Sequence, residues 1–246
     1  MIIPLFKPSF GDDEVEAVSE VLRSHWLGLG PKTAEFERRL SDYVGVDYVV
    51  ALNSCTAALH IALKAMGVKE GDEVLVPAIT FVSTAHAVAY CGAKPVFVDI
   101  NMEDYCMDPK KLETILEKDK YKKIKAAIIT DYGGQPAQWE KFFELKKKYK
   151  IILINDNCHA IGSNIKKNYG YATKYADFAT LSFHPVKAIT TGEGGAVLTN
   201  NLNYDNKAKL LRSHGMERKN NIYWVYKMNH LGFNFRLNFL SLFSLF

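Results

Sequence analysis

The stretch QWEKFFELKKKYKIILIND (residues 138–156) indicates the fold class of this chain. Its first part, 138–149, has a helical pattern, and its second part, 151–156, is a short apolar run that ends at Asp156. A short apolar run of this kind is typical of a strand that is buried on both faces. A helix followed by such a strand is the repeating unit of a parallel sheet covered by helices.

The same alternation extends to both sides of this stretch. Helical patterns cover 10–25, 31–45 and 56–67, and the other strand-like runs are 48–52, 73–77, 95–99, 126–130 and 178–183. The alternation predicts an α/β fold with a mostly parallel sheet flanked by helices. In such sheets ligands bind beyond the carboxyl ends of the strands, so the residues that follow each strand are candidates for a site.

The composition is that of an ordinary globular domain. The 246 residues are 48% hydrophobic and 24% charged, with a net charge of +4, which suits one large domain with its own core. Lysine-rich runs at 118–125 and 146–150 are broken by Tyr and Ile and are typical of solvated helix ends, so we expect no nucleic-acid partner. No apolar run reaches ~18 residues and the first ten residues lack a signal-peptide pattern, so we expect no membrane partner and a cytoplasmic location.

The four cysteines form no recognisable metal or redox motif. Cys55, Cys91, Cys106 and Cys158 include no CxxC pair, and the Cys and His residues show no metal-ligand spacing. We therefore expect reduced thiols and no metal site.

Two strand ends carry residues that suit a phosphorylated, flat ligand. Ser54, Cys55 and Thr56 follow strand 48–52 and open a helix, where free backbone amides and hydroxyls form a seat for a phosphate. An ordinary N-cap explains the same residues. Phe81 lies at the strand-to-helix junction after 73–77, where it could stack on a ligand or belong to the core.

Two later strand ends carry charged residues. Asp156 ends a strongly apolar run and His159 follows it, and a carboxylate placed there is costly unless a cation meets it. Its alternative role is to cap the next segment. After strand 178–183, with Ser182 near its end, come His184 and Lys187; a lone lysine on a turn is most often a surface charge.

One ligand accounts for all of these residues together. A phosphate suits 54–56 and Ser182, a flat ring suits Phe81, a pyridinium nitrogen suits Asp156, and an aldehyde suits Lys187. These are the parts of pyridoxal phosphate, and the lysine would hold it as a Schiff base.

From these residues outward, the sequence resembles the DegT/StrS family of pyridoxal-phosphate-dependent sugar aminotransferases over nearly its whole length, up to about Asn238. This family has the fold-type I architecture of aspartate aminotransferase. The resemblance is carried by segments such as GPKTAEFERRLSDYVGV (30–46), NSCTAALHIALKAMG (53–67), NDNCHAIGS (155–163), SFHPVKAITTGEGGAVLTNN (182–201) and LGFNFRLN (231–238).

The resemblance implies a role for each matching residue. Lys187 would be the Schiff-base lysine, Asp156 would pair with the pyridine nitrogen, and His159 would approach the ring hydroxyl. Phe81 would stack on the ring. The remaining matches would contact the phosphate: Ser54, Cys55, Thr56 and Ser182 in the same subunit, and Asn234 in the partner subunit, which implies a homodimer with a shared active site.

The resemblance also implies a reaction. Within the family, SFHPVKAITTGEGGAV and DYGGQPAQW look most like members that act in pseudaminic acid biosynthesis. We therefore expect transfer of an amino group from glutamate to a UDP-linked 4-keto-6-deoxy-N-acetylhexosamine, with residues 24–31 and His184 near the sugar nucleotide. Another UDP- or dTDP-linked keto sugar is the alternative acceptor.

The sequence departs from the family pattern at its end. After NFRLN it continues as FLSLFSLF, where the family pattern leads into a C-terminal domain. We therefore expect a pyridoxal-phosphate-binding large domain over 1–238, an aberrant apolar tail over 239–246 and no C-terminal small domain, which leaves open that this is an inactive truncated member. Two other functions are disfavoured. A dehydratase of this family would carry His in place of Lys187. A nucleotide-binding module built on GEGG (192–195) would need the Lys-Ser/Thr of a phosphate loop, which this motif lacks.

Overall fold

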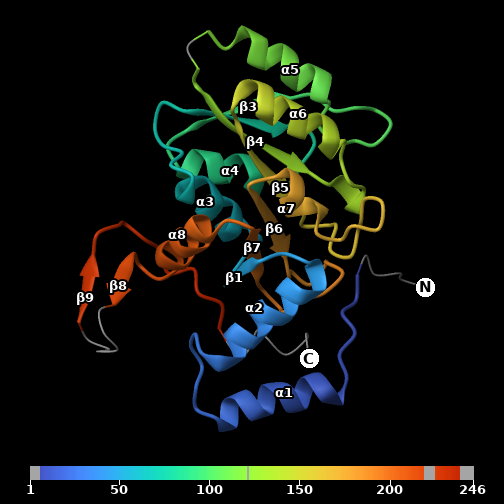
Figure 1. The fold of residues 1–246 in the computed structure, drawn as a ribbon. Helices are drawn as coiled ribbons and strands as arrows, with labels where there is room; N and C mark the ends of the chain where they lie inside the picture. Colours follow the sequence, from blue (N-terminus) through green and yellow to red (C-terminus); the bar gives the residue numbers. More distant parts are fainter. Residues whose placement is uncertain (1–5, 121, 219–224, 239–246) are drawn as a thin grey trace.

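A seven-stranded sheet forms the centre of the computed structural model, which describes residues 6–120, 122–218 and 225–238 (Figure 1). The strand order is β1-β7-β6-β5-β4-β2-β3. The strands are β1 (Tyr48–Leu52), β2 (Glu73–Pro77), β3 (Lys94–Val98), β4 (Ile124–Thr130), β5 (Ile152–Asp156), β6 (Phe178–Ser182) and β7 (Gly195–Thr199). Only β7 runs antiparallel to its neighbours, β1 and β6, so the predicted mostly parallel sheet is confirmed.

Helices cover both faces of the sheet. They are α1 (Asp12–Arg23), α2 (Pro31–Val44), α3 (Cys55–Ala65), α4 (Ser83–Tyr90), α5 (Pro109–Lys118), the 3₁₀ turn η1 (Tyr132–Gly134), α6 (Trp139–Tyr149), α7 (Tyr171–Tyr175) and α8 (Leu202–Arg212). One core cluster packs α2, α5, α6 and α7 on one face, and a second packs α3, α4 and α8 on the other.

Each central strand contributes side chains to both clusters. In β4, Ala127 and Ile129 belong to one cluster while Ala126 and Ile128 belong to the other. This alternation explains why the strands read as continuous apolar runs, since neither face meets water.

The elements expected from the sequence are present, with ends shifted by a few residues at most. The strand expected over 95–99 spans Lys94–Val98, and the helix expected over 10–25 spans Asp12–Arg23. A hairpin of β8 (Met216–Arg218) and β9 (Tyr226–Met228), which the patterns did not indicate, extends away from the sheet (Figure 1). The predicted tail, 239–246, lies outside the described residues, so the division at 238 stays a prediction.

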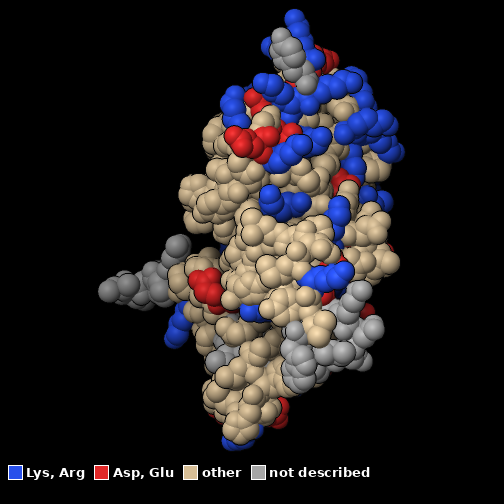
Figure 2. Space-filling view, turned by 90° about the vertical axis from the view of Figure 1, so that its left-hand side faces the viewer, with Lys and Arg blue, Asp and Glu red and all other residues tan. Residues whose placement is uncertain are grey.

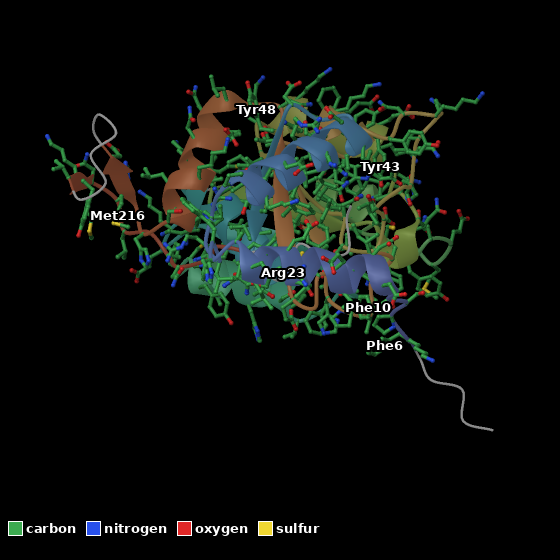
Figure 3. All side chains as sticks on the ribbon, turned by 90° about the horizontal axis from the view of Figure 1, so that it is seen from below. Phe6, Phe10, Arg23, Tyr43, Tyr48 and Met216 are labelled. Carbon is green, nitrogen blue, oxygen red and sulfur yellow. The ribbon has the colours of Figure 1, made fainter. Side chains whose placement is uncertain are left out.

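The first described residues run along the lower side of the molecule. Seen from below, α1 crosses this side with Phe10 before its start and Arg23 at its end, while Met216 of the hairpin lies well to one side (Figure 3). Phe6 lies close to Phe10, on the part of the chain that leads into α1 (Figure 3).

Basic side chains are concentrated at one end of the molecule, and acidic side chains lie between them (Figure 2). Lys148 pairs with Glu113 at 2.7 Å and Lys166 pairs with Glu140 at 2.8 Å, and exposed pairs of this kind contribute little to stability. In the described part of the chain, no helix combines the length and apolar character needed to cross a bilayer. The cytoplasmic location stays a prediction.

Candidate active site

The register of the sheet brings several predicted residues to one edge. Leu52 and Ser182 both pair with Gly195, so the ends of β1 and β6 meet the start of β7 at the same level. Thr130 pairs with Asp156 and Asp156 with Thr180, which places the end of β5 on this edge as well. The edge is therefore the carboxyl end of the parallel strands, where a ligand site was expected.

The start of α3 is open to an anion at this edge. Ser54 is the N-cap, and its hydroxyl accepts a hydrogen bond from the amide of Ala57 at 3.1 Å. The amides of Cys55 and Thr56 precede the first intrahelical bond, from Ala58 to the Ser54 carbonyl, and so remain available to a ligand. The Ser54 side chain thus takes the N-cap role that the sequence left open.

The start of β7 passes directly against this helix end. A Cβ atom added at Gly195 would lie 2.4 Å from the carbonyl carbon of Ser54 and 2.5 Å from the amide nitrogen of Cys55. Only glycine leaves enough room for this approach. The anion seat therefore has backbone on two sides, from α3 and from β7.

Asp156 presents a buried carboxylate at the same edge. Only 2% of the residue is exposed. Its Oδ2 accepts a hydrogen bond from the Thr84 hydroxyl at 3.2 Å, and its Oδ1 accepts one from the Cys158 amide at 3.4 Å. Within the described residues Asp156 makes no ion pair with a cationic side chain. A buried carboxylate with so few partners is costly, so a cationic ligand group would stabilise it.

Lys187 and Asp156 both influence the pKa values of the same three neighbouring side chains. Burial raises the pKa of the Cys55 thiol; the charge of Asp156 raises it further, and the ammonium of Lys187 acts in the opposite direction. The pKa of the Cys158 thiol is also raised, mainly by burial; the charge of Asp156 raises it further and that of Lys187 lowers it. Burial lowers the pKa of His159, and Lys187 lowers it further while Asp156 opposes the change. The lysine and the carboxylate therefore share one electrostatic environment with these three side chains.

Lys187 lies on a closed loop between β6 and β7, which we call the Lys187 loop (residues 183–194). Its base is joined by a hydrogen bond from the Phe183 amide to the Gly194 carbonyl at 2.9 Å, and the Lys187 amide donates to the His184 carbonyl at 2.9 Å. A cavity of about 460 Å³ opens between residues 185–190 of this loop and residues 6–10 and 14. A primary amine on a fixed loop beside a cavity can reach a bound molecule.

The remaining predicted residues are Phe81, Ser182 and Asn234. Phe81 is 72% exposed and follows β2, so its ring is free to cover a ligand. Ser182 ends β6, and its hydroxyl accepts a weak hydrogen bond from the His184 amide at 3.5 Å. Asn234 is exposed and pairs with Ser213, and no hydrogen bond or ion pair joins it to the other predicted residues in the described chain.

A second buried carboxylate, Asp131, was not predicted from the sequence. Asp131 follows β4 directly and is fully buried. It accepts five hydrogen bonds of 2.7–3.0 Å, from the Ala137 amide, Trp139 Nε1, Asn155 Nδ2, Asn157 Nδ2 and the Tyr171 hydroxyl. Burial raises the pKa of Asp131, and the hydrogen bonds that it accepts oppose that rise. Its position after an apolar run is the same signal that singled out Asp156.

Three threonines that the sequence did not single out lie behind Asp156. Thr130 ends β4, Thr80 follows β2, and Thr84 is in the first turn of α4. Their hydroxyl groups form a connected series that ends at Oδ2 of Asp156. Nothing in the local sequence around any one of them indicates this arrangement.

Comparison with known proteins places these features in a family. Residues 8–241 match the DegT/DnrJ/EryC1/StrS aminotransferase family. A UDP-4-amino-4,6-dideoxy-N-acetyl-beta-L-altrosamine transaminase of Campylobacter jejuni (serotype O:23/36) is 44% identical over 226 residues, which cover 92% of this chain and 58% of that protein. The chain thus spans less than two thirds of the length of this relative.

Solved structures agree with the sequence relatives. Helicobacter pylori PseC, an aminotransferase of pseudaminic acid biosynthesis, superposes with a TM-score of 0.88 at 32% identity, covering 98% of this chain and 63% of PseC. Streptococcus pneumoniae Spr1654 in its PLP form gives a TM-score of 0.88 at 32% identity, covering 99% of this chain and 65% of Spr1654. The fold around the candidate site is therefore that of these proteins.

Proposed function

Because this chain belongs to the DegT/DnrJ/EryC1/StrS aminotransferase family, we propose that it carries the cofactor site of a pyridoxal-phosphate-dependent sugar aminotransferase. The proposed donor is glutamate, and the proposed acceptor is a UDP-linked 4-keto-6-deoxy-N-acetylhexosamine. The acceptor class is supported by the 44% identity to the Campylobacter transaminase, whose name specifies an amino sugar of this kind.

The residues at the sheet edge fit pyridoxal phosphate. The seat formed by the amides of Cys55 and Thr56 suits a phosphate, and any side chain at Gly195 would close it. The exposed ring of Phe81 suits a flat aromatic ligand. Lys187, on its closed loop, supplies the primary amine that an aldehyde requires.

The observation that carries the proposal is the buried carboxylate of Asp156, which lacks a cationic partner in the described chain but lies within electrostatic reach of Lys187. A protonated pyridine nitrogen would supply the missing positive charge. When bound, pyridoxal phosphate provides an electron sink that stabilises negative charge on the carbon next to the reacting nitrogen.

Each residue of this chain then has a defined task. Asp156 holds the proton on the ring nitrogen, and Phe81 orients the ring. Lys187 would hold the cofactor through its aldehyde, and its Nζ, when free, would act as the base that moves a proton at the reacting carbon. His159, whose pKa is lowered mainly by burial, offers a neutral imidazole near the ring hydroxyl.

We also propose that two copies share each site. Asn234 is exposed, and no hydrogen bond or ion pair joins it to the other predicted residues in the described part of its own chain. This position suits a contact with the phosphate bound by a second copy. The cavity beside the Lys187 loop suits the sugar nucleotide, since Lys7 in its lining attracts a diphosphate.

The test is a transamination assay with a panel of acceptors. The chain is incubated with pyridoxal phosphate, glutamate and UDP- or dTDP-linked 4-keto sugars, and products are identified by mass spectrometry. We expect an amino sugar from the UDP-linked N-acetylated substrate, and none with Lys187→Ala. Exclusive turnover of dTDP-linked sugars would contradict the proposed acceptor, and turnover by Lys187→Ala at the wild-type rate would contradict the mechanism.

A further inference from the structure

Three threonine hydroxyls connect the end of β4 to the buried carboxylate of the candidate site. Thr130 Oγ1 lies 3.2 Å from Thr80 Oγ1, which lies 2.8 Å from Thr84 Oγ1. Thr84 Oγ1 lies 3.2 Å from Oδ2 of Asp156. We call Thr130, Thr80 and Thr84 the threonine series.

The carboxylate fixes the direction of every hydrogen bond in the series. An ionised carboxylate only accepts, so the single hydroxyl proton of Thr84 points to Asp156. The Thr84 oxygen must then accept the proton of Thr80, and the Thr80 oxygen must accept that of Thr130. All three hydroxyl dipoles therefore point the same way, towards the negative charge, and each bond strengthens the next.

Burial makes this arrangement effective. Thr84 is completely buried and Thr130 is 3% exposed, so the low local dielectric strengthens the interaction. The other groups that face Asp156 are the Cys158 amide at 3.4 Å and, through space, His159 and Lys187. Thr84 donates a hydroxyl hydrogen bond to this carboxylate at 3.2 Å, and the Cys158 thiol also forms a side-chain hydrogen bond with it.

We propose that the threonine series is a positioning device that keeps Asp156 ionised and directed at the ring nitrogen of the cofactor, with Thr84 its principal residue. This inference rests on the proposed function, since it takes that nitrogen as the partner of Asp156. A donor that stabilises the ionised carboxylate favours a proton on the nitrogen. Without the Thr84 hydroxyl the carboxylate loses this hydrogen bond, and its ion pair with the protonated ring nitrogen weakens.

The test compares two substitutions at one position. Thr84→Val keeps the shape of the side chain but removes the hydroxyl, whereas Thr84→Ser keeps the hydroxyl. Thr199→Val is the matched control, because Thr199 is likewise buried, at 1% exposed, and its hydroxyl donates to a backbone carbonyl at the other end of β7. Each protein is loaded with pyridoxal phosphate labelled with ¹⁵N in the ring, and the nitrogen chemical shift and the dissociation constant of the cofactor are measured.

For Thr84→Val we expect the nitrogen signal to move towards that of neutral pyridine, and cofactor binding to weaken about tenfold, as for loss of a hydrogen bond to a charged group. Thr84→Ser and Thr199→Val should keep the wild-type signal. Thr80→Val, one link further away, should shift the signal in the same direction by a smaller amount. A structural defect alone would weaken binding without moving the nitrogen signal.

The outcomes separate the two proposals. If wild-type protein binds the cofactor with a protonated nitrogen and Thr84→Val does the same, the inference is wrong while the proposed function stands. An equal shift in Thr84→Ser would also contradict it, because the hydroxyl would then be irrelevant. If the wild-type protein binds no cofactor, the proposed function is wrong, and the inference is wrong with it.

Discussion

The backbone amide of Asp131 donates a hydrogen bond to the backbone carbonyl of Asp156 at 3.1 Å. This bond joins the ends of β4 and β5, and it places two buried acids next to each other with different surroundings. The Asp131 carboxylate is enclosed by five donors from the protein, including Asn155 and Asn157 on either side of Asp156. Asp131 therefore anchors the strand end that presents Asp156.

The first prediction concerns this anchor. Asp131→Asn should lower the free energy of unfolding by about 3 kcal/mol, because an amide group would face buried donors that need an acceptor. Chemical denaturation measures the loss, with Asp47→Asn at an exposed position as the control. A loss below about 1 kcal/mol would show that the five hydrogen bonds are not required for stability.

The second prediction concerns pH. Burial, with a smaller effect of Lys64, lowers the pKa of His60 to about 4 from 6.5, and its Nε2 has no hydrogen-bond partner in the described chain. The unfolded chain binds the proton more readily, so the free energy of unfolding should rise with pH between about 4 and 6.5 and then level off. The full contribution is about 3 kcal/mol.

Denaturation of wild type and His60→Leu across this pH range measures that contribution. The difference between the two proteins should change with pH by the stated amount, because other titrating groups affect both equally. Parallel profiles would mean that His60 is protonated equally well in the folded and unfolded states.

The third prediction concerns the anion seat. Gly195→Ala should lower the free energy of unfolding by about 2 kcal/mol and weaken binding of pyridoxal phosphate, because the new Cβ would overlap the backbone of Ser54 and Cys55. Gly28→Ala is the matched control, since a Cβ there has no neighbour within 4 Å. If Gly195→Ala bound pyridoxal phosphate as tightly as the wild type, the phosphate would not bind at this seat.

The sequence predicted the parts of the site that depend on strand order alone. Asp156 and Lys187 follow apolar strands, and the parallel sheet brings such residues to one edge. The same reasoning would have found Asp131, but its donors come from segments as distant as Tyr171, and no local pattern indicates that they converge.

The threonine series could not be predicted, because it depends on register and helix placement. Thr130 and Asp156 are paired across β4 and β5, while Thr84 reaches Oδ2 only because α4 packs over this part of the sheet. The position of Asn234 relative to a second copy depends on assembly, which one chain does not specify. The β8–β9 hairpin is too short to show a periodic pattern.

The central claim is that Lys187 bonds to pyridoxal phosphate. The most direct measurement is to mix the chain with the cofactor, reduce it with borohydride, digest it and locate the modified lysine by mass spectrometry. The account predicts a pyridoxyl phosphate group on Lys187, lost in Lys187→Ala and retained in a control, Lys174→Ala, at an exposed position on α7. Modification spread over surface lysines, with no preference for Lys187, would contradict it.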